Sequence, residues 1–352
     1  MAFEDLLQKF IDDAGFAQWG ATKLERPLSF TYYENWIREG HHGEMAYLET
    51  HLPIKENPET KWPEFKSVIV FSIPYYPTND FGKELPVQLV KTAFYAQNWD
   101  YHHWVKDKLQ GLTTQLQQQH PNETFAVAVD SSPLMERDYA HRAGLGWFGK
   151  NTCLIHPKKG SLFFLAEILT SLNLEKKNDP IPDFCGKCQR CMEVCPTGAI
   201  EAPRILNAQK CISYLTIESR EVPPIELRDK MGSWFFGCDL CQTICPWNQK
   251  IFTASIHHDE TPTEADTENR PKLIKELEWI LTTSGNQLQK SFAGTPMARA
   301  GSFGLKRNAI VVAANKGLTE LAPSVELLLG HEKLGELAQW CLEKFARNSA
   351  DE

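Results

Sequence analysis

The sequence has little that would place it in a membrane. Its most apolar segment, residues 162–172, contains Glu167 and is about half as long as a membrane-spanning helix needs to be. Residues 1–7 show neither a basic stretch followed by an apolar run nor a twin-arginine pair, as an export leader would. We therefore expect a cytoplasmic protein that does not enter the membrane.

Suitably placed glycine-rich nucleotide loops and an excess of basic residues are also missing. No G-x-G-x-x-G sequence follows an expected strand, and no G-x-x-x-x-G-K-[ST] loop occurs, so a nucleotide site of either kind is unsupported. The 37 Lys and Arg residues are outnumbered by 45 Asp and Glu residues, which gives a net charge of -8. This balance excludes a uniformly basic surface, but not a local one.

Cysteine is the residue that the sequence has in unusual number. Eight of the ten cysteines fall between positions 185 and 245, and only Cys153 and Cys341 stand apart. Because a reducing cytoplasm keeps thiols reduced, clustered cysteines there bind metal more often than they form disulfides. We expect the eight to be metal ligands and the other two to pack as small apolar side chains.

The spacing of the eight cysteines is typical of a ferredoxin with two clusters. A C-x2-C-x2-C-x3-C-P run begins at Cys185, and a C-x2-C-x3-C-P run begins at Cys238 after a lone Cys211. Such runs give three thiolates to one 4Fe-4S cube and the fourth to another. Zinc sites also use C-x2-C pairs, but they need neither the third cysteine nor the C-P ending. The predicted sets, with an exchange of the two terminal cysteines left open, are Cys185, Cys188, Cys191 and Cys245 for one cube and Cys195, Cys211, Cys238 and Cys241 for the other.

The 352 residues are enough for two or three domains of ordinary size. We expect a mixed fold of the α/β or α+β class, arranged in four parts. These are an N-terminal α/β domain at 1–175, a ferredoxin-like two-cluster domain at 176–256, an acidic linker or loop at 257–272 and a HEAT-like helical region at 273–352.

Hydrophobic periodicity predicts the elements of the N-terminal domain. We expect one helix from residue 3 to 11, ended by Gly15, and two helices within 86–119 that are broken near 98–100. Ligands usually bind at the loops that follow the strands of such a domain. The strands are predicted from short β-branched runs at 67–73, 124–129, 152–156 and 162–169.

Asp130 directly follows an apolar strand and is the first candidate catalytic residue. A carboxyl there can be partly desolvated, which raises its pKa and suits it to donate a proton. It could equally cap a turn ahead of Pro133. Nearby, Gly144, Gly146 and Gly149 would let a large flat ligand approach the backbone.

Residues 100–103, Asp-Tyr-His-His, match the start of the Asp-x-His-x-x-Gly signature by which some cobalamin proteins supply a histidine to cobalt. Val105 stands where the glycine should be. Asp100 could instead be the N-cap of a helix. The motif alone leaves both roles open.

Five stretches together resemble the epoxyqueuosine reductase family, in order and over nearly the whole chain. They are residues 130–137, residues 143–152, the run from Cys185, residues 211–218 and residues 307–309. The resemblance implies an oxidoreductase that reduces epoxyqueuosine to queuosine in tRNA, by cob(I)alamin chemistry fed by two 4Fe-4S clusters. It also implies a cobalamin-binding fold similar to that of reductive dehalogenases.

The same resemblance implies roles for individual residues. Asp130 would be the catalytic proton donor beside the cobalamin. The departure at Val105 implies base-off cobalamin that His102 does not anchor. The other residues implied to contact the cofactor are Lys55, where the family often has arginine, and Lys150, Asn151, Thr152, Ser213, Thr216 and Glu218.

A basic stretch near the C-terminus offers a place for the tRNA. Residues 279–319 contain no Asp or Glu but five Lys or Arg. We expect this face to contact phosphates of the anticodon stem-loop, although a solvated helix face has the same pattern. We also expect a low-potential electron donor as a partner, and a monomeric protein. The predicted tRNA contacts are Arg137, Arg142, Arg299, Lys306 and Arg307.

Three other functions share part of this pattern. A reductive dehalogenase-like corrinoid enzyme acting on a small molecule would use both cofactors but should lack the basic helical tail. A pure electron-transfer module would leave the first 175 or so residues unexplained. A helical-repeat RNA-binding protein with structural zinc would show no turnover.

Overall fold

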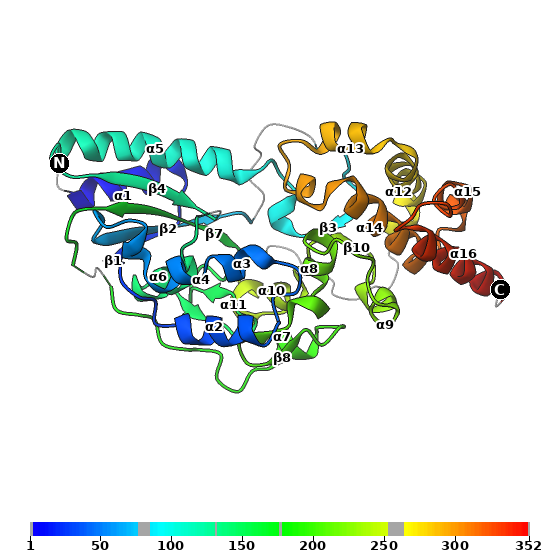
Figure 1. Ribbon diagram of the computed structural model, residues 1–352, viewed down its shortest axis with the longest axis horizontal. Helices are drawn as coiled ribbons and strands as arrows, with labels where there is room; N and C mark the ends of the chain where they lie inside the picture. The colour runs from blue at the N-terminus through cyan, green and yellow to red at the C-terminus, as the bar shows by residue number, and fades with distance from the viewer. Residues whose placement is uncertain (1–2, 77–84, 131, 176–177, 253–263, 351–352) are drawn as a thin grey trace.

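In the computed structural model, helices α1 (Phe3–Ala14) and α16 (Gly335–Ala350) lie at opposite ends of an elongated molecule (Figure 1). The structure describes all residues except 1–2, 77–84, 131, 176–177, 253–263 and 351–352. A four-stranded sheet with its helices forms one end, and the cysteine-rich region lies between it and the C-terminal helices. Among the described helices, none is both long and apolar enough to cross a membrane.

A four-stranded sheet carries the N-terminal domain. Its order is β1 (Gln18–Lys23), β2 (Ser67–Pro74), β7 (Phe163–Thr170) and β4 (Phe125–Val129), and each neighbouring pair is antiparallel. Antiparallel pairing assigns this domain to the α+β class and not to the α/β class, whose strands run parallel. The α/β prediction for residues 1–175 is corrected accordingly.

The sequence pattern does not predict β1, because its residues QWGATK contain few β-branched side chains. Gly20, in the middle of this strand, lies against the end of helix α6 (Glu136–Arg142). A Cβ atom on Gly20 would lie 2.3 Å from the carbonyl oxygen of Ala143. Glycine therefore permits the close approach of α6 to the sheet.

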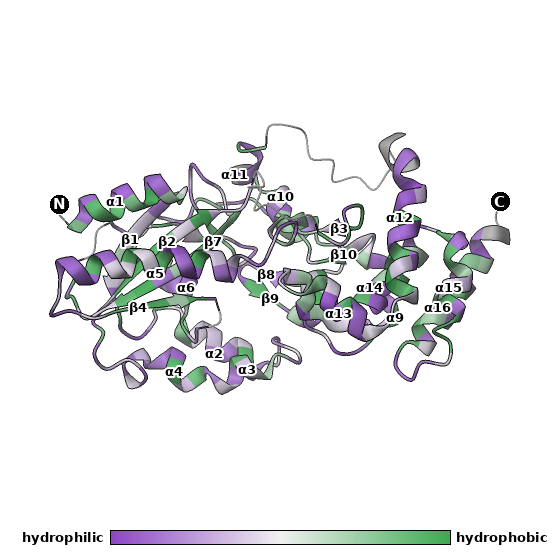
Figure 2. Cartoon of the chain, turned by 90° about the horizontal axis from the view of Figure 1, so that it is seen from above, coloured by the Kyte–Doolittle hydropathy of each residue, from purple (hydrophilic) through white to green (hydrophobic). Residues whose placement is uncertain are grey.

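Alternating side chains give the sheet two apolar faces. One face packs against α1 and α5 (Tyr101–Gln119), and the other packs against α6. Both α1 and α5 carry polar and apolar stripes, as Figure 2 shows. The predicted strands at 67–73 and 124–129 are confirmed, as is the first helix, which ends before Gly15 with a φ of 73°.

The segment 86–119 contains one long helix, not two. Helix α5 begins after Asp100, and the residues before it form the short strand β3 (Lys91–Thr92) and a 3-10 turn at Phe94–Ala96. Strand β3 pairs in parallel with β10 (Trp234–Phe236), in the cysteine-rich region. The two-helix prediction is wrong because pairing with β10, more than a hundred residues later in the chain, holds residues 91–92 in an extended conformation.

The two other predicted strands both form, but they do not pair with each other. Strand β6 (Leu154–Ile155) pairs with β5 (Trp147–Phe148), whereas β7 joins the main sheet. The turn of residues 149–152 therefore lies at the end of a separate two-stranded ribbon. This ribbon brings the turn to the cysteine-rich region.

The cysteine-rich region and the C-terminal helices share one hydrophobic core. Helix α14 (Gly301–Asn315) is buried along most of its length, and the Asn308 amide donates hydrogen bonds to the carbonyl oxygens of Thr216 and Phe235, each at 2.8 Å. Of the predicted acidic linker, residues 264–272 belong to a helix, and residues 257–263 lie outside the described residues. The remaining helices and strands are α2 (Phe30–Arg38), α3 (Ala46–Thr50), α4 (Leu52–Glu56), α7 (Arg190–Glu193), β8 (Ile200–Ala202), β9 (Ile205–Leu206), α8 (Ile212–Ile217), α9 (Ile225–Arg228), α10 (Leu240–Thr243), α11 (Pro246–Gln249), α12 (Glu264–Thr282), α13 (Gly285–Phe292) and α15 (Ala322–Glu326).

Glu167 is a buried carboxyl in the middle of the sheet. Its exposure is 0%, and neither carboxyl oxygen has a hydrogen-bond partner among the described residues. It lies between Val70 and Ala128 of the two neighbouring strands. Burial, assisted by the nearby carboxyl groups of Glu136 and Asp130, raises the pKa of Glu167 well above its ordinary value. Glu167 is therefore a neutral acid near pH 7.

We predict that Glu167→Gln stabilises the protein relative to the wild type by an amount that grows with pH. The unfolded chain releases the Glu167 proton above roughly pH 4.3, whereas the folded chain keeps it. Each further pH unit, up to the folded-state pKa, then destabilises the wild type by at most about 1.4 kcal/mol. Glutamine has no such proton to lose. Thermal unfolding of both proteins between about pH 5 and about pH 8.5 measures the difference.

Glu326→Gln is the matched control, because Glu326 is exposed on α15. Its unfolding temperature should follow that of the wild type at every pH. A Glu167→Gln shift that is the same at every pH would contradict a neutral Glu167.

Candidate functional site

An aspartate and a histidine meet at the end of strand β4. Asp130 follows the strand with a φ of 29°, a conformation that is strained for a residue other than glycine. One of its carboxylate oxygens lies 2.8 Å from Nε2 of His102, in the first turn of α5. Nδ1 of His102 is hydrogen-bonded to Asp100. Asp100 also accepts the His102 backbone N–H at 3.0 Å, so its predicted role as a helix N-cap is confirmed.

The charge of this pair differs from the sequence prediction. The hydrogen bond from His102 lowers the pKa of Asp130, against the opposing effect of burial. Burial works against a charged His102, but the hydrogen bonds to Asp100 and Asp130 outweigh it and raise the pKa of His102 to about 9. The predicted raised pKa at Asp130 is therefore wrong. At neutral pH the proton of the pair is therefore on His102, which donates it in the hydrogen bond to Asp130.

One side of Asp130 is open to solvent, and ionisable side chains lie behind the other side. Its side chain is 56% exposed. Behind it, burial and the charge of Asp130 raise the pKa of Glu136 to about 8, and Oε1 of Glu136 has no hydrogen-bond partner among the described residues. The Lys55 ammonium donates a hydrogen bond to the Leu134 carbonyl oxygen at 2.9 Å, and burial lowers its pKa. Lys55 is thus close enough to Asp130 for their charges to interact, and its contact with the cofactor stays a prediction.

The opposite side of this space is formed by the C-terminal part of the chain. Arg299 makes a two-pronged ion pair with Glu218, and its guanidinium lies 5.6 Å from the centre of the Tyr47 ring. Arg299 is close enough to Asp130 to help lower its pKa. Asp130 in turn is close enough to Tyr47 to help raise the pKa of the tyrosine. The predicted residues Glu218 and Arg299 therefore lie near Asp130.

Thr216 is part of the core and does not face Asp130. The hydroxyl group is buried, donates to the Ile212 carbonyl oxygen at 2.7 Å and accepts the Gly237 backbone N–H at 2.9 Å. Its hydrogen-bonding capacity is used within the protein, so a side-chain contact to a cofactor is not supported. Ser213, one turn earlier on α8, is half-buried.

The turn of residues 149–152 holds the cysteine loops. The Lys150 ammonium donates hydrogen bonds to the carbonyl oxygens of Gly186 and Cys188, both at 2.8 Å, and the Asn151 amide donates to the Cys241 carbonyl oxygen at 3.0 Å. Thr152, with a φ of 68°, accepts a hydrogen bond from Arg137 at its carbonyl oxygen. The side chains of Lys150 and Asn151 are thereby directed to the cysteine loops, and the contact of this turn with the corrin stays a prediction.

A cavity of about 240 Å³ lies beside this turn. Trp147 donates its indole N–H to the Cys185 sulfur at 3.5 Å on one side of it. The thiol of Cys191 is close enough to those of Cys185, Cys188 and Cys245 for their charges to raise its pKa further, after burial, to about 11. The four cysteines that line this cavity are the predicted first set, Cys185, Cys188, Cys191 and Cys245.

The thiols of the second predicted set also lie close to one another. Burial raises the pKa of Cys238, and the charges of Cys211 and Cys195 contribute in the same direction. Cys241 is affected by both Cys238 and Cys211. Within the described residues, no three Cys, His, Asp or Glu side chains are arranged to hold a single metal ion.

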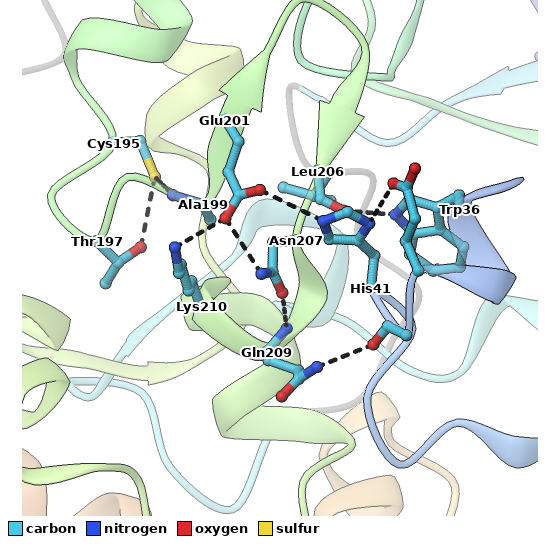
Figure 3. A network of polar contacts seen from close by, with 12 residues as sticks. Trp36, His41, Cys195, Thr197, Ala199, Glu201, Leu206, Asn207, Gln209 and Lys210 are labelled. Carbon is cyan, nitrogen blue, oxygen red and sulfur yellow. Dashed lines mark hydrogen bonds and ion pairs between the residues drawn. The ribbon is translucent and has the colours of Figure 1, made fainter. Parts of the chain in front are cut away.

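Figure 3 shows a polar network that supports the loop after Cys195. The Cys195 sulfur accepts the Ala199 backbone N–H at 3.3 Å. Glu201, on strand β8, pairs with Lys210 at 2.7 Å and with His41 at 3.3 Å. The network therefore ties the hairpin of β8 and β9 to the N-terminal domain, beside Cys195.

Two of the predicted tRNA contacts are buried. Arg142 pairs with Glu25 at 2.5 Å. Arg307 is 0% exposed and donates to the carbonyl oxygens of Ser219 and Glu221, at 2.6 and 3.0 Å. Neither guanidinium can reach a phosphate, so these two predictions are corrected. Arg142 is used in a side-chain ion pair and Arg307 holds backbone carbonyl groups, which charge counting in a sequence cannot detect.

Of the other predicted contacts, Arg137 and Arg299 are exposed. Lys306 is half-buried and donates to the Leu281 carbonyl oxygen at 2.8 Å. His102 was not predicted as a partner of Asp130, and no role was predicted for Glu136 or Tyr47. The Asp-x-His spacing at Asp100 was the available signal for His102.

Comparison with known proteins identifies the family. A model described as "Epoxyqueuosine reductase QueG, DUF1730" matches residues 55–131, and one described as "4Fe-4S double cluster binding domain" matches residues 184–248. The chain is 34% identical to an epoxyqueuosine reductase of Escherichia coli strain K12 over 339 residues, which cover 94% of this chain and 86% of that one. It is 41% identical to the enzyme of Cyclobacterium marinum over 239 residues, which cover 68% and 74%.

Solved structures agree with the sequence matches. An epoxyqueuosine reductase with an epoxyqueuosine-modified tRNA-Tyr stem loop has a TM-score of 0.78 at 28% identity, covering 97% of this chain and 89% of that one. The enzyme of Bacillus subtilis, with its catalytic aspartate loop swung out of the active site, has a TM-score of 0.78 at 27% identity, covering 97% and 91%. With residues 184–248 matching a 4Fe-4S double-cluster domain and relatives similar over most of both chains, the protein belongs to the epoxyqueuosine reductase family.

Proposed function

We propose that this protein reduces epoxyqueuosine to queuosine in tRNA, with two 4Fe-4S clusters and cobalamin as cofactors and Asp130 as the residue that delivers a proton. The observation that carries the proposal is the pairing of Asp130 with His102 at an open face of the molecule. The cysteine runs that would hold the electron-carrying clusters lie in the same chain, and the turn at Lys150 and Asn151 is hydrogen-bonded to them.

The residues around Asp130 fit a large polar cofactor such as cobalamin. Glu136 presents an acceptor oxygen that lacks a partner among the described residues, and amide groups of a corrin could supply one. Lys55 and Tyr47 add polar groups on two sides. When bound, cobalamin would supply a low-potential cobalt centre able to attack or reduce the epoxide.

His102 is not the residue that would hold cobalt. Both of its ring nitrogens are hydrogen-bonded to carboxylates, one to Asp100 and one to Asp130. A histidine needs a free nitrogen lone pair to bind a metal. This supports base-off cobalamin without histidine ligation, as the replacement of the signature glycine by Val105 implies.

Conversion of an epoxide to an alkene and water consumes two electrons and two protons. The His102–Asp130 pair holds one proton at neutral pH, and Asp130 is the member that is directed to the open space. Glu136, with a pKa of about 8, holds a second proton next to Asp130. The site therefore carries the protons that the departing oxygen requires, and Asp130 places one of them.

We place the tRNA over the same open face, against the C-terminal helices, which we regard as a HEAT-like platform. Arg137 and Arg299 are exposed there, and Lys290 and Lys316 are exposed elsewhere on this region. The modified base must leave its loop to reach Asp130. The solved relative with a modified stem loop supports this placement of the substrate class.

The first test is Asp130→Asn. Asparagine keeps the size of the side chain but cannot deliver a proton, so turnover should fall by about a hundredfold or more. Wild-type turnover should also decline as the pH rises through about 9, where His102 loses its proton. The measurement is single-turnover conversion of an epoxyqueuosine tRNA stem loop under anaerobic conditions, over a pH series.

Asp107→Asn is the control, because Asp107 is an exposed residue of the same helix as His102. It should leave the rate and the pH profile unchanged. Wild-type activity in Asp130→Asn, with normal iron and corrin content, would refute the role of Asp130.

The second test separates ligand cysteines from the others. Cys211→Ser should lose one cluster, and so about half of the iron. Cys153 is half-buried and lies near thiols of both sets, but we assign it no cluster, so Cys153→Ser should keep all of the iron. Iron analysis and the electron paramagnetic resonance spectrum of the reduced proteins measure this. Full iron content in Cys211→Ser would contradict the assignment.

A further inference from the structure

The first cysteine set is the one that reaches the surface. Cys188 is exposed, whereas each cysteine of the second set is at most half-exposed. Electron transfer between proteins requires that the two redox centres come close together. An electron from outside would therefore enter through the cluster that we assign to Cys185, Cys188, Cys191 and Cys245.

The mouth of this cavity is basic although the chain as a whole is acidic. Arg190 and Lys250 line the cavity and are exposed, and Lys187 is exposed beside Cys188. None of the three pairs with a carboxylate in the described part of the chain. Against a net charge of -8, three cations without a counter-charge form a local positive field.

An apolar centre lies within these charges. Phe184 is 49% exposed, and its ring contacts those of Trp147 at 5.3 Å and Trp247 at 5.9 Å. The Lys250 ammonium lies 4.5 Å from the centre of the Trp247 ring. Trp147 in turn contacts the Cys185 sulfur. A small apolar centre with a charged rim is the composition expected of a transient protein interface.

We propose that this surface, the donor face of Phe184, Lys187, Arg190, Trp247 and Lys250, docks an acidic protein that carries single electrons. The inference rests on the cluster assignment made above. In each encounter the carrier is oxidised by one electron and the cluster is reduced by one. No proton moves, and two encounters supply the two electrons of one turnover. Carboxylates of the carrier would meet the three cations, which favours fast association and fast release.

RNA is also attracted by positive charge, but the observations favour a protein carrier here. An exposed cluster ligand, Cys188, has no use in an RNA contact, and phosphates over it would block electron entry. Asp130 lies near Arg299, which pairs with Glu218, and none of these three residues lines the cavity. Separate contact residues would allow the carrier to bind while the tRNA stays in place.

The experiment uses the double variant Arg190→Glu/Lys250→Glu in the cluster-loaded protein. Reduction of the clusters by a reduced acidic two-cluster ferredoxin is followed by stopped-flow absorbance without oxygen. The rate at low salt should fall by about tenfold or more relative to the wild type, and the two rates should converge at high salt. Photoreduced deazariboflavin, a small reductant without a docking surface, should reduce both proteins equally.

Lys106→Glu/Lys108→Glu is the matched control, because both lysines are exposed on α5, which packs against the sheet away from the cysteine loops. It makes the same change in net charge and should leave the ferredoxin rate within about twofold of the wild type. Equal loss in both double variants, or no loss in Arg190→Glu/Lys250→Glu, would overturn the docking proposal.

Two further outcomes are informative. If the double variant binds the tRNA stem loop more weakly but accepts electrons normally, the surface belongs to RNA and the proposal is wrong. If deazariboflavin reduces no cluster in the wild-type protein, the cluster assignment itself fails, and the docking proposal fails with it. The iron content and spectrum of each variant distinguish these cases.

Discussion

The hydrogen bonds that Lys150 and Asn151 make to the cysteine loops connect the two halves of the molecule. One ammonium holds the carbonyl oxygens of Gly186 and Cys188, and one amide holds that of Cys241, so a single turn contacts both cysteine runs. The turn itself is fixed to the N-terminal domain by the ribbon of β5 and β6. Because this turn contacts both runs, it helps to fix the position of the two proposed clusters relative to each other, together with the pairing of β3 with β10. The C-terminal helices extend the same core and close the site with Arg299.

Charge in the site is controlled by burial as much as by pairing. Asp130 is ionised because His102 stands next to it, whereas Glu136 and Glu167 behind it are held neutral by burial and by the charge of Asp130. A second and third negative charge in this space would be unfavourable in a low dielectric. The arrangement stores protons next to the residue that is proposed to deliver one. It also leaves that residue on a strained backbone at the edge of the sheet.

The sequence predicted best where spacing alone determines chemistry. The cysteine runs implied two clusters, and a double-cluster family model matches the same region. Strands β2 and β4 followed from local runs of β-branched residues. Strand β3 and its neighbours could not be predicted, since their conformation depends on pairing with β10. The burial of Arg307 and Thr216 could not be predicted either, because it depends on partners far away in the chain: Arg307 donates to the Ser219 carbonyl oxygen, and Thr216 accepts the Gly237 N–H. The pKa of Asp130 was predicted in the wrong direction because its partner, His102, comes from another element.

The central claim is that electrons and protons collected by this chain reduce epoxyqueuosine in tRNA through a corrin. The most direct test supplies the anaerobic, cluster-loaded protein with an epoxyqueuosine tRNA stem loop and a low-potential reductant, with and without cobalamin, and analyses the nucleosides by mass spectrometry. The account predicts queuosine only when cobalamin and the reductant are both present. Queuosine formed without cobalamin, or unchanged epoxyqueuosine with every component present, would contradict it.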